Sequence, residues 1–192
     1  MARKLSPQKR EQFLQAALSL FVENGVTRTS TSAIAKKAGT AAGTLFLYFP
    51  TKQDLIHTLV LDIGLEQSES IKARLNPSLS VRETFFAIWE GSLHWFLEHY
   101  MAYQFIRQVR DSGIIAPEVV AESEPYFDYY FQAIQRGLAE NQIKSYPIEL
   151  VGSLLYQSVV AVMNLMGANP DPAIKTAYIQ AGFDIFWDGI KT

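Results

Sequence analysis

The 192-residue sequence predicts an all-α fold with about nine helices. Apolar residues recur at the three- and four-residue spacing of amphipathic helices. No run alternates apolar and polar residues with the period of two that marks a half-buried strand. Serine, threonine, glycine and proline stand where the periodic segments begin and end. These observations predict helices joined by short turns.

Capping residues predict the first two helices. Ser6 before Pro7 predicts an N-cap followed by proline at the first helical position, and Gly25 supplies the stop. Ser30 caps a short second helix. Gly39 ends that helix because glycine adopts the left-handed turn conformation without strain.

The third and fourth helices follow directly. A short helix is predicted over residues 41–48, because Pro50 interrupts the pattern. Thr51 with Asp54 three residues later forms a capping box. The box opens a long fourth helix, which must end before Pro77.

A second capping box, Ser80 with Glu83, opens a helix over residues 81–100. Its inner face is marked by an apolar stripe: Val81, Phe85, Trp89 and Phe96. The remaining helical patterns cover residues 100–111, 118–142, 148–167 and 173–189.

Charge is divided unevenly along the chain. Residues 1–55 hold eight Lys and Arg against three Asp and Glu, whereas the remaining residues hold nine against sixteen. A basic N-terminal region followed by an acidic remainder indicates that the N-terminal region binds a polyanion. An ordinary solvated helix surface gives the same count.

Nothing in the sequence predicts export or a membrane span. Cysteine is absent, which fits a reducing compartment, and no apolar run follows the basic N-terminus. The uncharged run from Leu150 to Pro170 contains polar residues, and a helix buried on several sides has the same composition. We therefore expect a cytoplasmic protein.

Two short helices joined by the turn AGTA and packed on a longer first helix describe a helix-turn-helix unit. The small residues from Thr40 to Thr44 let a helix end approach a major groove closely, while Leu45 and Phe49 face the core. Lys52 stands in the first turn of a helix, where the macrodipole disfavours a cation. A bound phosphate explains that placement, and a solvated surface lysine is the alternative.

The stretch TSTSAIAKKAGTAAGTLFLYFPTKQDL, residues 29–55, resembles the signature of the TetR family of bacterial repressors. LFVENG, residues 20–25, is similar to the end of that family's first helix. The resemblance covers residues 13–55. It implies a homodimer with an N-terminal DNA-binding domain and a larger helical domain that binds an inducer.

Position by position, the resemblance implies a set of DNA contacts. Ser32 falls where the family's second helix reaches DNA. The base-facing start of the recognition helix is Ala41, Ala42 and Gly43. The phosphate-contacting positions are Thr44, Tyr48 and Lys52.

The sequence departs from the family at two places. Phe46 stands where the family usually has tyrosine, which removes one hydroxyl contact to phosphate. The start of the recognition helix has no long polar side chain, so base reading must use thymine methyls, DNA shape and a few polar residues. Those polar residues are Ser32, Lys36 and Thr40. Arg3 and Lys4 form either a flexible arm over the adjacent groove or a solvated terminus.

The C-terminal three quarters of the chain is rich in aromatic residues, which form either a plain core or the wall of a ligand cavity. Buried tyrosine and tryptophan need partners for their polar tips, and this favours a cavity for some of them. The predicted ligand-binding residues are Trp89, Phe96, Phe105, Tyr126, Tyr130 and Gln157.

The helix near 148–167 is apolar nearly all round, and the helix near 173–189 has an apolar stripe along one side. We expect them to pair with a second copy in a four-helix bundle. The only histidines are His57, His94 and His99; His94 and His99, five apart on a helix, do not converge on a metal, and no nucleophile–base arrangement or cofactor motif is present.

The sequence therefore predicts a helix-turn-helix DNA-binding domain over residues 1–50 and a helical ligand-binding and dimerisation domain over residues 51–192. We expect a non-enzymatic homodimer that represses transcription from a palindromic operator of double-stranded DNA. A small hydrophobic or aromatic effector is expected to release it. A helical small-molecule carrier or enzyme with an aromatic cavity is the alternative.

Overall fold

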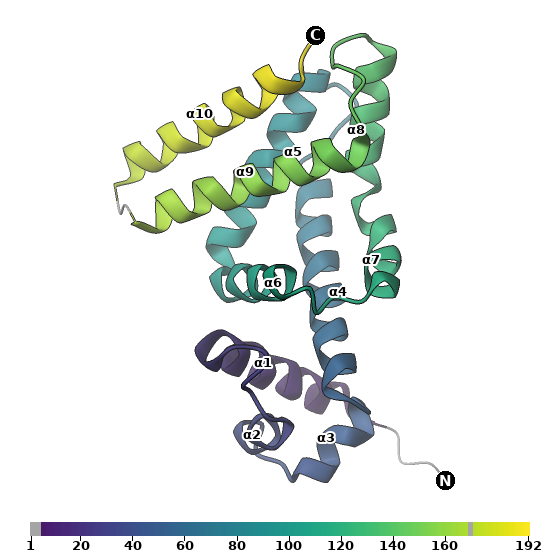
Figure 1. Cartoon of the computed structure of the whole chain (residues 1–192), viewed down its shortest axis with the longest axis vertical. Coiled ribbons are helices and arrows are strands. Elements are labelled where there is room, and N and C mark those ends of the chain that lie inside the picture. The colour runs from purple at the N-terminus through teal and green to yellow at the C-terminus, as the bar shows by residue number, and fades with distance from the viewer. Residues whose placement is uncertain (1–4, 169–170) are drawn as a thin grey trace. The chain divides into compact units, whose positions relative to one another are not determined.

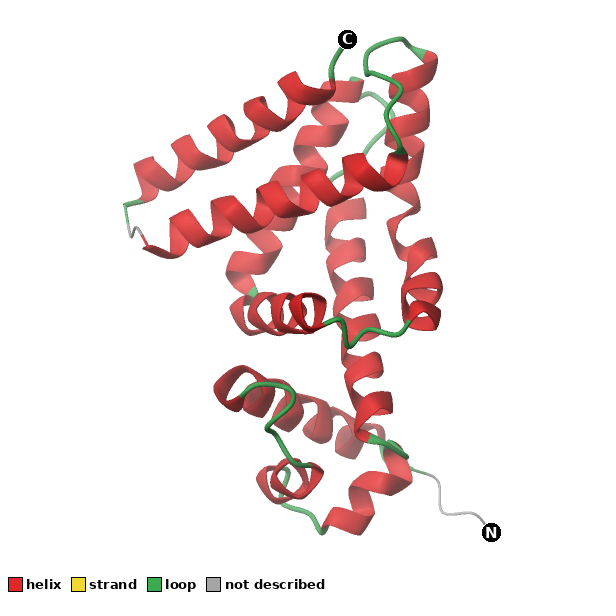
Figure 2. Ribbon diagram, viewed as in Figure 1, coloured by secondary structure: helices red, strands yellow, loops and turns green. Residues whose placement is uncertain are grey.

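The computed structural model describes residues 5–168 and 171–192, in which the regular elements are helical (Figures 1 and 2). These residues form ten α-helices and one short 3-10 helix, η1, without a strand. The all-α prediction is confirmed. The elements are α1 (Pro7–Asn24), α2 (Thr31–Lys37), α3 (Ala42–Tyr48), α4 (Lys52–Lys72), α5 (Val81–Glu98), α6 (Tyr100–Ser112), α7 (Pro117–Ser123), η1 (Glu124–Phe127), α8 (Asp128–Ala139), α9 (Ile148–Ala168) and α10 (Pro172–Ile190).

The chain divides into two compact units. The first runs to Leu65 and also contains His99–Ser123, and the second contains Glu66–Glu98 and Glu124–Thr192. Helix α4 therefore begins in the first unit and ends in the second. The functional boundary expected between residues 50 and 51 stays a prediction.

Capping fixes the helix ends of the first unit as the sequence predicts. The Ser6 hydroxyl accepts from the Lys9 N–H (3.4 Å), and the Ser30 hydroxyl accepts from the Ala33 N–H (3.2 Å). Gly39 has φ +69°, a left-handed conformation that a side chain rarely tolerates. Each hydroxyl satisfies a backbone N–H in the first turn of a helix, and the left-handed Gly39 ends α2. These features are local, so they do not depend on the rest of the fold.

The core of the first unit lies where α1 meets α2 and α6, with α3 packed on α2. The Phe105 ring of α6 stacks on the Phe21 ring of α1, with centroids 5.8 Å apart. Five of the fully buried side chains come from α1, α2, α3 and the start of α4: Phe13, Phe21, Ile34, Leu45 and Leu55.

The second unit is built around α5, which contacts α8, α9 and α10. All four residues of the predicted inner stripe are buried, so the prediction for this helix is confirmed: Val81, Phe85, Trp89 and Phe96. Gly182 allows α10 to approach closely, because a Cβ there would lie 2.6 Å from Val162 and 2.9 Å from Trp89. Helices α9 and α10 run beside each other, as Figure 1 shows.

The prediction of one helix over residues 118–142 is wrong. The structure has α7, then η1, then α8, and α8 ends at Ala139. Pro125 lies inside η1, where its ring and missing N–H prevent a continuous α-helix. The buried Ser68 hydroxyl of α4 donates to the Tyr126 carbonyl and holds this break in place.

One helix of the described ranges, Ile148–Gly167, has the length and mean hydropathy (1.5) of a membrane span. Only 28% of that window is buried within the chain. The core helix of a soluble protein passes the same test, so a single such helix is weak support for membrane insertion. The limited burial does show that this chain alone leaves much of the helix uncovered.

Candidate nucleic-acid interface

The second and third helices form a compact helix-turn-helix. Ile34 and Ala35 of α2 are buried, and Leu45 and Phe49 face the core as predicted. The Thr40 N–H and hydroxyl both donate to the Ala35 carbonyl, at 2.9 and 3.3 Å. These bonds fix the turn between the two helices, so the start of α3 is held in one position.

The predicted base-facing residues are exposed. Ala41, Ala42 and Gly43 lie on the surface at the start of α3. Ala41 is the N-cap and supplies no side-chain hydrogen bond to the helix. This end of α3 is therefore small and free of obstruction.

The predicted polar contacts differ in how far they are engaged within the unit. The Ser32 hydroxyl lies 3.0 Å from that of Ser30, and the Tyr48 hydroxyl accepts from the Ser6 N–H at 3.0 Å. Thr44 is half-buried. Lys36 is exposed and makes no ion pair or side-chain hydrogen bond in the described residues. Arg3 and Lys4 lie outside the described residues.

Lys52 makes contacts that the sequence did not suggest. Its ammonium donates to the carbonyls of Val26 at 2.5 Å and Thr27 at 3.3 Å. Burial lowers the pKa of Lys52 below its usual value. The carbonyls of the turn after α1 thus stabilise a cation in the first turn of α4. A phosphate contact through the remaining N–H of Lys52 stays a prediction.

Two other basic residues of the first unit, Lys37 and Arg28, differ in their surroundings. Lys37 is held by Glu23 (3.0 Å) and by the Ser19 hydroxyl (2.7 Å), so its charge is neutralised within the unit. Arg28 is exposed and lines a cleft of about 330 Å³ beside Ser30, at the start of α2. Arg28 is not among the DNA-binding residues predicted from the sequence.

The six predicted ligand-binding residues do not all lie together. Phe105 belongs to the first unit, and the other five belong to the second. Trp89 is fully buried, with its indole N–H donating to the Ile179 carbonyl at 3.1 Å, and Phe96 is buried as well. Gln157 is exposed. The assignment of all six as ligand contacts stays a prediction.

Tyr130 differs from the other aromatic residues of the second unit. Its hydroxyl is buried and has no hydrogen-bond partner in the described residues. Burial raises the pKa of the Tyr130 hydroxyl far above its usual value. Gly152 of α9 faces this hydroxyl, since a Cβ there would lie 3.5 Å from it. An unpaired buried hydroxyl is costly, so Tyr130 is a site where a polar ligand atom would be stabilised.

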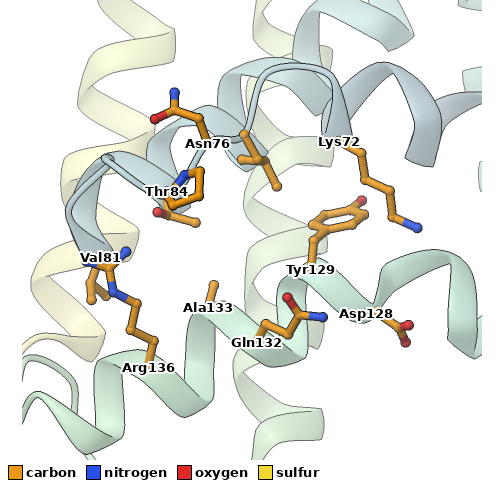
Figure 3. A pocket seen from close by; sticks show the side chains of 11 residues that line it. Lys72, Asn76, Val81, Thr84, Asp128, Tyr129, Gln132, Ala133 and Arg136 are labelled. Carbon is orange, nitrogen blue, oxygen red and sulfur yellow. The ribbon is translucent and has the colours of Figure 1, made fainter.

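A cleft of about 620 Å³ opens in the second unit between the end of α4, the start of α5 and α8 (Figure 3). Tyr129, Lys72 and Arg136 lie on its walls. Arg136 is already bound to Glu140 (2.7 Å) and to the Leu79 carbonyl (2.6 Å). None of the six predicted ligand-binding residues lines this cleft.

The fold and the exposed third helix define a helix-turn-helix DNA-binding protein. The model of the family described as "Bacterial regulatory proteins, tetR family" matches residues 13–59. The HTH-type transcriptional regulator YvdT of Bacillus subtilis is 43% identical over 68 residues, which are 35% of each chain. The fatty acid metabolism regulator protein of the same organism is 44% identical over 55 residues, 27% of this chain and 28% of that one.

A solved structure extends the similarity over the whole chain. A putative tetR family transcription regulator from Shewanella sp. PV-4 has a TM-score of 0.89 and 26% identity, covering 96% of this chain and 98% of that one. Residues 13–59 therefore match the TetR family of transcriptional regulators, and the chain has the fold of a TetR-family regulator. The sequence matches to the two Bacillus subtilis regulators span about a third of their length.

Proposed function

We propose that this TetR-family regulator is a homodimeric repressor that binds a palindromic operator and is released by a small hydrophobic or aromatic effector. The observation that carries the proposal is the exposed third helix of a fixed helix-turn-helix, combined with an apolar helix pair that the chain leaves uncovered. The first supplies a DNA-reading element, and the second requires a partner.

The partner proposed for α9 and α10 is a second copy of the chain. Leu150 and Ile185 are 49% and 76% exposed, and other large apolar side chains of the two helices are exposed as well: Leu154, Leu165 and Ile174. Exposed apolar area of this kind marks an interaction surface. An isologous four-helix bundle would bury it and would present two helix-turn-helix units to half-sites about one DNA turn apart.

Ile185→Glu tests the dimer, because an unpaired charge buried in an apolar interface is strongly disfavoured. We expect light scattering to show a dimer for the parent protein and a monomer for the variant. Val120→Glu is the matched control, since Val120 is also an exposed helical residue but lies on α7. A parent protein that is monomeric at all concentrations would contradict the proposal.

The proposed DNA binding is tested by measuring affinity for a selected operator and for random duplex as salt rises. Neutralised phosphates release counterions, so both affinities should fall linearly with log salt concentration while the operator stays preferred. A carrier or enzyme that merely has a basic surface would show no sequence preference at any salt concentration.

The proposed effector site is supported by Tyr130, whose buried hydroxyl lacks a partner. Hydrophobic and aromatic compounds would be screened for release of the operator by fluorescence anisotropy. A releasing compound that bonds to this hydroxyl should act on Tyr130→Phe at about 2- to 10-fold higher concentration, the value of one hydrogen bond. Tyr146→Phe, at an exposed position, is the control. Equal response of both variants would remove Tyr130 from the effector site.

A further inference from the structure

The outward side of α3 is apolar. Leu45 points inward and is fully buried. At 100° per residue, Gly43 and Leu47 lie on the side opposite Leu45, and Ala42 with Phe46 forms the adjacent row. Leu47 is 67% exposed and Phe46 is 44% exposed. Two large apolar side chains are therefore held in solvent on the helix that faces DNA in this family.

None of these four residues has a side-chain atom that donates or accepts a hydrogen bond. Thr44 of α3 is half-buried, and two polar side chains next to this face make hydrogen bonds within the protein. The Thr40 hydroxyl donates to the Ala35 carbonyl, and the Tyr48 hydroxyl accepts from the Ser6 N–H. Side-chain hydrogen bonds from α3 to base edges are consequently scarce.

We infer that Phe46 and Leu47 determine operator specificity by contacting the 5-methyl groups of thymine. The inference rests on the proposed function, because it takes α3 to lie in the major groove. The thymine methyl is the apolar group that base pairs present in that groove, while the other distinguishing groups are donors and acceptors. An apolar helix face therefore distinguishes A·T from G·C pairs mainly through this methyl.

Lys36 offers the competing explanation. It is exposed on α2 and unpaired in the described residues, so it is able to reach guanine acceptors. Recognition through Lys36 would produce half-sites fixed at G·C pairs. The two explanations therefore predict different operator sequences. They also predict different changes in operator affinity when the thymine methyl is removed.

Deoxyuridine provides the test, because it pairs like thymidine but lacks the methyl. Operators would first be selected from a random duplex library with the full-length protein. We expect half-sites with fixed A·T pairs. Replacing one fixed thymine per half-site by uracil should weaken binding about fourfold for each methyl, or about 15-fold for two. Uracil placed outside the fixed positions should change nothing.

A variant assigns the contact to the side chain. Leu47→Ala removes an exposed side chain, so the fold is retained, which circular dichroism would verify. For this variant, replacing the thymine that Leu47 contacts by uracil should cause no further loss of affinity. The reason is that the leucine side chain, which is the partner of the methyl group, has already been removed. Phe46→Ala should do the same at a neighbouring thymine.

The contrary results are distinct. Half-sites fixed at G·C pairs, or operator affinity that is unaffected by uracil, would overturn the inference while leaving the repressor function intact. In that case Lys36→Met should relax the preference for guanine. Selection that enriches no duplex at all would overturn the proposed function itself, and the inference with it.

Discussion

Replacing Lys52 by methionine tests whether this residue holds the start of α4 to the turn after α1. Methionine keeps an apolar stem but removes the ammonium, so the carbonyls of Val26 and Thr27 lose their donor. The bond to Val26 is part-buried and the bond to Thr27 is exposed, so the first dominates. A hydrogen bond from a charged donor contributes about 1.5–3 kcal/mol, and we expect a loss of that size.

Urea unfolding at fixed protein concentration measures the loss. With a slope of about 1–3 kcal/mol per molar urea, the midpoint should fall by about 1 M. Lys36→Met is the matched control, since the Lys36 side chain makes no hydrogen bond or ion pair within the described residues and its loss should leave the midpoint unchanged. The fixed concentration matters because unfolding of a dimer depends on it.

An unchanged urea midpoint in Lys52→Met would refute this reasoning. The same variant also decides the predicted phosphate contact. One contact from each subunit of a dimer contributes about 1.8 to the slope of log affinity against log salt concentration. A fall of that size would assign the remaining N–H of Lys52 to DNA. An unaltered slope would remove Lys52 from the DNA-binding residues.

Three further predictions concern stability. Gly182→Ala should lower the free energy of unfolding in urea by about 1–3 kcal/mol, because the added Cβ would overlap Val162. Gly189→Ala is the control: no atom of the described residues lies within 4 Å of its added Cβ, so this variant should be neutral or stabilising. Hydrogen bonds from the Ser80 hydroxyl and then from its N–H lower the pKa of Glu83. The ionised carboxylate therefore contributes to the stability of the folded protein at neutral pH, and this contribution is lost as pH falls below the usual carboxyl value. Glu83→Gln should flatten the corresponding decline of the melting temperature at acidic pH. Tyr130→Phe should stabilise the ligand-free protein by about 1 kcal/mol in urea, because it removes a buried hydroxyl without a partner; a destabilised variant would show that a partner exists.

Local chemistry explains why the first half of the fold was predictable. Both capping boxes form as the sequence indicates. The N–H of Thr51 donates to Asp54 at 2.9 Å, and the N–H of Ser80 donates to Glu83 at 2.7 Å. Such contacts join residues three positions apart, so their outcome does not depend on the rest of the molecule.

The errors arise where distant residues decide the structure. The helix predicted over residues 118–142 ignored Pro125, and its break is completed by Ser68, 58 residues before Tyr126. For Lys52, the sequence suggested either a bound phosphate or a solvated side chain, and the phosphate contact stays a prediction. Neither alternative included the backbone carbonyls 25 and 26 residues away that accept hydrogen bonds from its ammonium.

The aromatic residues show the same limit at the candidate effector site. The sequence predicts Trp89 and Tyr130 as ligand contacts on the same ground: each carries a polar group on a large apolar side chain. The Trp89 indole N–H reaches the carbonyl of Ile179, which has a lone pair left beyond its own helix bond, so its polar group is satisfied within the second unit. The Tyr130 hydroxyl faces Gly152 and reaches no such group. Since residue type and helical spacing are the same for a satisfied and an unsatisfied side chain, only the packing of the second unit separates a structural aromatic residue from a candidate ligand contact.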